Sequence, residues 1–286
     1  MKEIRSFILA ACVLALLGVQ ARADSFIYNG FSNTSGLTMV GNTATANTSD
    51  GTVLRVTPAA GGQAGAAYHT TPFTLGLGNT FSSQFQFRFT NPGGIDPADG
   101  ITLVLAASPT GLGTGGGAIG YGGVPNSVAI EFDTFNNGYG DGYSSNHVAV
   151  DTNGNLNDLG LVNVYGVQSC DFSGGYAKPG CMSNGDLWTA TIGYDGSNLN
   201  VTLKDGAGAE FVALNNLPID IASYLGTNSA YVGFTSGTGA GWENHDILDW
   251  RFADTATLPP SVPEPGTLAL LGTGLAAVLR RRMRRA

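Results

Sequence analysis

Short runs of alternating apolar and polar residues recur along this chain, and each run is bounded by Gly, Asn, Asp or Pro. The clearest are SSQFQFRFT, GITLVLAAS, SVAIEFDTF, HVAVDTNG, LWTATIGY, LNVTLKD, AYVGFTS and HDILDWRF. Alternation with a period of two places the apolar side chains on one face of a strand. No long stretch of residues 24–252 has helical periodicity, and the chain contains 43 glycines, which suit tight turns. The pattern predicts an all-β fold, with one large β-sandwich over residues 24–252.

The first 23 residues have the features of a secretory signal peptide. Lys2 and Arg5 give a basic start, an apolar stretch follows from Phe7 to Leu17, and small residues surround the expected cleavage point after Ala23. We therefore expect a secreted protein whose mature chain begins at Asp24.

The last 25 residues, 262–286, form a second targeting unit behind a linker at 253–261. Their apolar run, Gly266 to Leu279, would make about 21 Å of helix, shorter than the ~30 Å hydrocarbon core of a bilayer. Five arginines follow, which would hold the C-terminus in the cytoplasm. An ordinary tail anchor is one interpretation. The sequence Val262-Pro263-Glu264-Pro265 before these features, however, resembles the PEP-CTERM sorting signal of Gram-negative bacteria. The resemblance implies transient anchoring in the inner membrane, removal by an exosortase-type enzyme, and delivery to the cell envelope or outside.

Removing both ends leaves a strongly acidic chain. Between residues 24 and 262 there are 19 acidic and five basic side chains, a net charge of −14. Such a surface repels nucleic acid and anionic membranes and favours cations and neutral ligands. Two cysteines also remain, Cys170 and Cys181, within one loop-like stretch. In an oxidising compartment they favour a disulfide over a metal site.

The stretch EFDTFNNGYGDGYSSNH, residues 131–147, carries the richest chemistry. Glu131, Asp133, Phe135 and Asn137 are two residues apart and would share one face of a strand. Asp141 and His147 follow in a glycine-rich loop and at the start of the next run. From the residues alone, this stretch fits a metal site, a pair of catalytic acids or a solvated hairpin.

Several segments, in order, resemble the legume-type (L-type) lectins. They are AGAAYHTTPF, SSQFQFRF, ADGITLVL, GGGAIGYGG, VAIEFDTFNN, NHVAVDTNG, LWTATIGYDG, and YVGFTSGTG with HDILDWRF. The resemblance spans nearly all of residues 24–252. It implies a concanavalin-like jelly-roll β-sandwich that binds carbohydrate beside a Ca²⁺ ion and a transition-metal ion such as Mn²⁺.

The resemblance also implies a set of metal ligands. Glu131 and His147 would bind the transition metal, and Asp133 would bridge both ions. Phe135 would give Ca²⁺ its backbone carbonyl and Asn137 its amide oxygen. Asp141 would be the second bridging carboxylate, although it stands one position early relative to the plant spacing. Carboxylate, amide and carbonyl oxygens suit Ca²⁺, and a histidine with carboxylates suits Mn²⁺ or another first-row ion.

The carbohydrate site follows from the same resemblance. Asp99, after a cis peptide bond, would accept hydrogen bonds from two sugar hydroxyls, and Gly116 or Gly117 would present a backbone N–H. Asn137 would donate from its amide nitrogen, and Phe135 would stack on the sugar. Trp242 stands in a loop where the family varies its specificity. The other two histidines, His69 and His245, fall in stretches with a structural role.

Two other classes of function compete with a lectin. Jelly-roll glycoside hydrolases can carry E-x-D-x-x-E on a strand, but here Asn136 stands where that pattern needs its general acid. A structural protein of the extracellular matrix could keep every one of these residues as framework. We expect a secreted, calcium-dependent lectin without catalysis, whose weak affinity per sugar would be raised by homo-oligomers or by attachment to the matrix.

Overall fold

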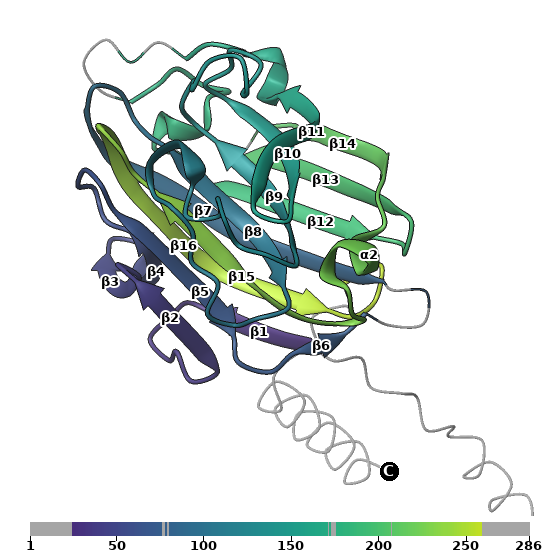
Figure 1. The fold of residues 1–286 in the computed structure, drawn as a ribbon. Coiled ribbons are helices and arrows are strands. Elements are labelled where there is room, and N and C mark those ends of the chain that lie inside the picture. The colour runs from purple at the N-terminus through teal and green to yellow at the C-terminus, as the bar shows by residue number, and fades with distance from the viewer. Residues whose placement is uncertain are drawn as a thin grey trace, which may run out of the picture.

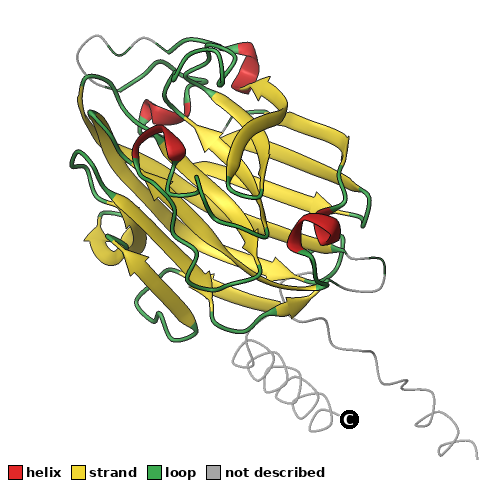
Figure 2. Cartoon of the chain, in the orientation of Figure 1, coloured by secondary structure: helices red, strands yellow, loops and turns green. Residues whose placement is uncertain are grey.

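The structure is a computed structural model that describes residues 25–75, 78, 80–170, 172, 176–206 and 208–258. Figure 2 shows that the regular secondary structure of this part of the chain is almost entirely strand, joined by many loops. Its one α-helix is the short α2 (Ile221–Leu225), and three brief 3₁₀ turns accompany it. Within the described residues, no helix has the length and apolarity needed to cross a membrane. The expected signal peptide and sorting segment lie outside the described residues.

Two antiparallel sheets face each other and form a jelly-roll sandwich (Figure 1). The first contains, in spatial order, β14 (Glu210–Pro218), β13 (Asn198–Asp205), β12 (Trp188–Tyr194), β7 (Phe81–Gly94), β16 (Gly241–Ala253), β4 (Gly51–Thr57) and β3 (Ala44–Thr48), with β1 (Ser25–Asn29) also paired to β16. The second contains β11 (Asn155–Asn163), β10 (His147–Thr152), β9 (Ser127–Asp133), β8 (Gly100–Ala106), β15 (Ser229–Gly237), β5 (Ala64–His69) and β2 (Leu37–Gly41), with β6 (Phe73–Thr74) on β15. The predicted all-β jelly roll is confirmed.

The core lies between the two sheets and follows the alternation seen in the sequence. Phe85 and Phe87 of β7 point inward and contact Phe132 of β9, with ring centroids 5.5 and 5.9 Å apart. Trp250 of β16 meets Phe234 of β15 at 4.7 Å. All five side chains are fully buried, and aromatic pairs at these separations add to the stabilisation from apolar burial.

Strands β8, β9 and β10 are buried on both faces, and this burial determines the surroundings of the acidic side chains on β9. Every residue of these three strands is buried. One face packs into the core, and a smaller apolar cluster that includes Tyr121 and Val124 of the loop after β8 covers Val104 and Ala129 on the other. Because strand side chains alternate, Glu131 and Asp133 share the face of Ala129. Both carboxylates therefore lie beneath loops rather than in open solvent.

The predicted disulfide is confirmed. Cys170 and Cys181 are bonded, with Cα atoms 6.1 Å apart. They form a small apolar cluster with Ala177 that packs against Val167 and Phe172.

Candidate functional site

Three of the predicted metal ligands meet where β9 pairs with β10. In this register Asp133 lies opposite His147, and Glu131 lies opposite Ala149. The His147 Nε2 atom is 3.3 Å from Glu131 Oε1, and both side chains are almost fully buried. Sheet pairing alone therefore brings together Glu131, Asp133 and His147.

Two further carboxylates, which the sequence analysis did not assign, join this group. Asp151 lies on β10, and Asp158 lies on the next strand, β11. One ligand atom from each of Glu131, His147 and Asp158 lies within 4.8 Å of the others. We call Glu131, His147, Asp151 and Asp158 the inner cluster. The outer loop is residues 134–146, which connect β9 to β10.

Burial, and then repulsion between neighbouring carboxylates, makes the ionised form of the acidic side chains in this region unfavourable. Burial, followed by repulsion from Asp151, raises the pKa of Glu131 well above its usual value. Burial, followed by repulsion from Asp141, raises the pKa of Asp133 in the same way. Burial also raises the pKa of Asp99 to about 7. None of these three shifts is opposed by a lysine or an arginine among the described residues. Within the part of the chain that the structure describes, no lysine or arginine therefore balances these carboxylates.

His147 carries no balancing charge either. Burial lowers the pKa of His147 to about 4, an effect opposed by a hydrogen bond with the Ser144 backbone. The imidazole is therefore neutral at pH 7, which is the form that binds a metal ion.

The donor set fits a bound divalent cation. The buried carboxylate oxygens that make no hydrogen bond include Glu131 Oε1, Asp151 Oδ2, Asp158 Oδ2 and Asp99 Oδ2. Uncompensated carboxylates of this kind are costly unless they bind a cation or take up protons. Carboxylates with an imidazole suit a first-row dication, and all-oxygen donors suit Ca²⁺.

The outer loop holds the remaining predicted metal ligands in a more open setting. The Phe135 backbone N–H donates to Asp133 Oδ1 at 2.7 Å, and the Asn137 backbone N–H donates to Asp141 Oδ2. Phe135 is half-buried, whereas Asn137 is exposed. Burial raises the pKa of Asp141 to about 6. These side chains lie in one loop whose own backbone donors satisfy the two aspartates.

Asp99 lies beside this loop at the start of β8. The Ala98–Asp99 peptide bond is cis, as the resemblance implied. The Thr134 backbone N–H donates to the Asp99 carbonyl at 3.0 Å, and Gly100 pairs with Asp133 in the sheet. The Asp99 side chain is 3% exposed. A backbone hydrogen bond therefore connects Asp99 to Thr134, and strand pairing connects the next residue, Gly100, to Asp133.

Glycines connect Asp99 to Asn137 across two loops. A Cβ atom on Gly239 would lie 3.6 Å from Asp99 Oδ2 and 3.4 Å from the Gly116 Cα, and one on Gly117 would lie 2.5 Å from the Asn137 amide. The Gly116 N–H already donates to the Thr238 carbonyl at 3.1 Å. Of the two predicted glycines, Gly117 is therefore the better candidate for a free amide.

The remaining residues named in the sequence analysis lie around this group. The half-buried Trp242 ring packs against the backbone of Gly93, where an added Cβ would lie 2.5 Å from its Nε1 atom. His69 stacks on Phe26 at 4.1 Å. His245 Nδ1 is 2.8 Å from Thr57 Oγ1, and its Nε2 accepts from the Gly100 N–H. Each of these side chains has packing or hydrogen-bonding partners of its own.

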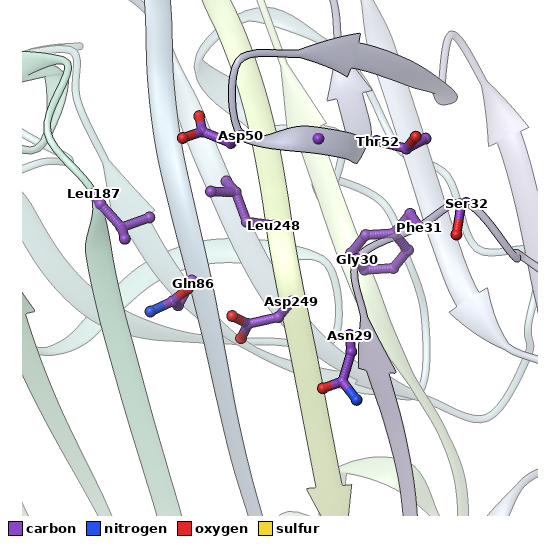
Figure 3. A pocket seen from close by; sticks show the side chains of 11 residues that line it. Asn29, Gly30, Phe31, Ser32, Asp50, Thr52, Gln86, Leu187, Leu248 and Asp249 are labelled. Carbon is purple, nitrogen blue, oxygen red and sulfur yellow. The ribbon is translucent and has the colours of Figure 1, made fainter.

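A polar pocket of about 670 Å³ lies elsewhere, on the outer face of the first sheet. Figure 3 shows Asn29 on β1, Gln86 on β7 and Asp249 on β16 around it, with Asp50 at the hairpin above. None of the residues predicted from the sequence to bind metal or sugar lines this pocket.

Models of two known families match this chain, one over the β-sandwich and the other over the C-terminal segment. A model of the legume lectin domain matches residues 23–266. A model of the PEP-CTERM protein-sorting motif matches residues 261–285.

Individual proteins that are similar to this chain are also lectins or contain an L-type lectin domain. A putative L-type lectin-domain containing receptor kinase I.1 of Arabidopsis thaliana is 29% identical over 280 residues, which is 89% of this chain and 40% of that protein. The lectin alpha chain of Lablab purpureus is 28% identical over 72% of this chain and 74% of its own length. The crystal structure of basic winged bean lectin with Tn-antigen matches with a TM-score of 0.65 and 26% identity, over 84% of this chain and all of that one. The chain spans less than half the length of the first two receptor kinases that it matches.

Proposed function

Because the chain belongs to the legume lectin family, we propose that it is a secreted, calcium-dependent lectin that binds exopolysaccharide or cell-surface glycans. Membership implies carbohydrate binding, and the sorting motif suggests delivery outside the cytoplasm of a Gram-negative bacterium. The calcium dependence, the ligand class and the residues that act are the proposal.

The contiguous path from Asp99 through Gly239, Gly116 and Gly117 to Asn137 carries this proposal. It offers a buried carboxylate oxygen without a hydrogen bond, a strip of backbone without side chains, and an exposed amide. Asp99 Oδ2 accepts from sugar hydroxyls, and the Gly117 N–H and Asn137 Nδ2 donate to sugar oxygens. Phe135, half-buried at the edge, offers its ring to the C–H face of the sugar.

Metal ions would hold this arrangement in place. Ca²⁺ would be held by Asp133, the Phe135 carbonyl, Asn137 and Asp141, and Mn²⁺ or a similar ion by Glu131, Asp133, Asp141 and His147. Positive charge there compensates the buried carboxylates. Because Asp99 and the outer loop adjoin Asp133, the sugar-binding groups depend on the same ions.

The geometry gives no support to glycoside hydrolysis by the strand carboxylates. Glu131 lies against His147 in the inner cluster, where the proposal assigns it to a metal ion rather than to a sugar. Asn136, exposed in the outer loop, carries an amide that cannot act as a general acid.

A glycan and polysaccharide array tests the proposal. We would probe it with the full chain in mild detergent, with Ca²⁺ and Mn²⁺ and then with EDTA. Binding that EDTA abolishes and that Asp99→Asn lacks is the expected result. Glu210→Gln is the matched control, because it removes one negative charge from an exposed position on β14.

Two outcomes would overturn the proposal. Binding that persists in EDTA would show that a different surface is used. No binding by folded, calcium-loaded protein would favour a matrix scaffold that keeps the fold without a sugar ligand. Anchoring, release by an exosortase and homo-oligomerisation are separate parts of the proposal, and mass spectrometry and light scattering of the secreted protein test them.

A further inference from the structure

Strand β11 bulges where it passes the inner cluster. Val150 of β10 pairs with Leu159, but Thr152, two residues later, pairs with Asn155, so β11 has two more residues than β10 across this interval. Asp158 lies in the bulge with φ of 45°, in the left-handed region that Asp tolerates better than most residues. A bulge can redirect a side chain out of strand alternation. Here the bulge places the Asp158 carboxylate beside Glu131 and His147.

Asp151 positions this bulge. Its Oδ1 atom accepts hydrogen bonds from the backbone N–H groups of Asn157 at 2.8 Å and Asp158 at 3.2 Å. Asp151 is fully buried and is held on β10, whose pairing with β9 is regular. The backbone around Asp158 is therefore fixed from the same strand that carries His147.

The ligand atoms of the cluster gather in one place: one atom each from Glu131, His147 and Asp158 lies within 4.8 Å of the others. Glu131 Oε1 and Asp158 Oδ2 are both buried and make no hydrogen bond, and Glu131 is 2% exposed. Two carboxylates facing each other beside a neutral imidazole form a pocket for a cation.

We propose that Asp158 is a direct ligand of the ion held by Glu131 and His147. The ligand set inferred from the family resemblance contains no residue of β11. This inference rests on the proposed metal dependence and deepens it, because it changes what the site selects. With Asp158 added, the proposed ligands of this ion are four carboxylates (Glu131, Asp133, Asp141 and Asp158) and one imidazole, a donor set that favours Mn²⁺ more than a site richer in nitrogen or sulfur would.

Direct titration with Mn²⁺ tests the inference. The free Mn²⁺ ion gives a strong EPR signal that bound Mn²⁺ loses, so binding to the metal-stripped full chain is measured without any sugar. We expect Asp158→Asn to weaken Mn²⁺ binding at least about tenfold, since even residues that only support a metal ligand change affinity by 10–100-fold. Glu210→Gln, with the same loss of charge outside the cluster, should leave it unchanged.

A second readout separates ligation from a structural role in the bulge. If Asp158 is a ligand, Asp158→Asn relieves repulsion with Glu131, and the metal-free variant should melt at the same temperature as the native protein or higher. If Asp158 only supports the bulge, the metal-free variant should melt lower, and Mn²⁺ binding should fall only as far as folding does.

Crystals of the native protein soaked in Mn²⁺ keep the inference testable even if the variant does not fold. Anomalous density in contact with Glu131, His147 and an Asp158 oxygen is expected. An ion held by Glu131 and His147 with Asp158 turned away would overturn the inference, as would native affinity for Mn²⁺ in Asp158→Asn or a native protein that binds no Mn²⁺. Failure to bind glycans, with Mn²⁺ binding intact, would instead overturn the proposed lectin function alone.

Discussion

The inner cluster and the outer loop hold neighbouring parts of one proposed metal site by different means. Glu131, His147 and Asp151 lie on paired strands β9 and β10, are nearly fully buried, and keep their positions through sheet hydrogen bonds. Asn137 and Asp141 lie in a loop, are exposed or half-exposed, and are held by the loop's own backbone. Asp133, at the last position of β9, lies between the inner cluster and the outer loop and is a proposed ligand in both halves of the metal site.

This difference indicates whether the inner cluster or the outer loop depends more on bound ions for its geometry. We expect the inner cluster to have its geometry before any metal binds, because sandwich packing fixes both strands, and to gain only charge compensation from an ion. We expect the outer loop to gain both order and charge compensation when an ion binds. Of the proposed sugar-binding groups, Asn137 lies within the outer loop and Asp99 lies beside it, so ligand binding should follow occupancy of that half more closely.

Asp133→Asn should have the largest effect, because it removes the carboxylate that both halves share. We expect glycan affinity to fall at least about 100-fold, or about 2.7 kcal/mol, together with loss of both Ca²⁺ and Mn²⁺ binding. Isothermal titration with each ion and with a glycan found on the array measures this. Loss of one ion with full retention of the other would contradict the role of Asp133 as a shared ligand.

The pH dependence of stability should reverse between the metal-free and the metal-loaded protein. Burial raises the pKa of Asp99 to about 7 and those of Asp141 and Asp151 to about 6, all from 3.8. A raised folded-state pKa contributes stability that is present below about pH 4 and is lost as pH rises toward 7. In EDTA the protein should therefore melt at a higher temperature at pH 5 than at pH 7.5. With Ca²⁺ and Mn²⁺ the order should reverse, because bound ions stabilise the ionised carboxylates.

Calorimetry at both pH values tests this, and two variants extend it to the comparison. Asp151 of the inner cluster and Asp141 of the outer loop have the same raised pKa of about 6, so Asp151→Asn and Asp141→Asn should flatten the metal-free pH dependence to a similar extent. A metal-free melting temperature that stays constant or rises between pH 5 and pH 7.5 would show that the carboxylates are compensated by some other means.

The inner cluster was more predictable from the sequence than the outer loop, but only where strand alternation holds. Glu131, Asp133 and His147 converge because a period of two and an antiparallel register together fix both face and partner. Asp151, four residues after His147 in HVAVDTNG, follows the same rule and could have been assigned from its spacing. Asp158 could not, because the bulge breaks the period that would have placed it.

The fold and the sugar-binding residues show a similar limit. Alternation and turn residues predicted β-strands and a sandwich, whereas the jelly-roll strand order followed only from the family resemblance, since several neighbouring strands, such as β7 and β16 or β8 and β15, are distant in sequence. Sequence also left Gly116 and Gly117 equivalent. The direction of a backbone amide depends on the path of the loop, and only the bond from Gly116 to the Thr238 carbonyl distinguishes them.

Loss of the disulfide should affect the outer loop more than the inner cluster. Gln168, near Cys170, accepts from the Ser145 N–H at 2.9 Å, and its Nε2 donates to the Gly142 carbonyl at 2.9 Å. The Cys170 N–H donates to Ser145 Oγ at 3.0 Å. A double Cys170→Ser, Cys181→Ser variant should lose roughly 3 kcal/mol of stability and several-fold in Ca²⁺ affinity, with a smaller change for Mn²⁺. Titrations with both ions, with dithiothreitol-treated native protein as the control, measure the ratio. An equal loss for both ions would mean that the segment supports the inner cluster as well.

Trp242→Ala should have the smallest effect on sugar binding, because the ring packs on Gly93 and Gly94 rather than joining the path from Asp99 to Asn137. An added Cβ on Gly94 would lie 2.8 Å from the ring, so the indole fills a space that both glycines leave for it. Truncation should lower the melting temperature by removing this packing, while changing glycan affinity only a few-fold. A sharp fall in affinity for one class of glycan, with no change for the others, would mean that Trp242 contacts that class and sets the selectivity of the site. The sugar-binding surface would then extend beyond the inner cluster and the outer loop. Array profiles of Trp242→Ala and Trp242→Phe decide this, because phenylalanine keeps an aromatic face there and should restore selection if stacking is its cause.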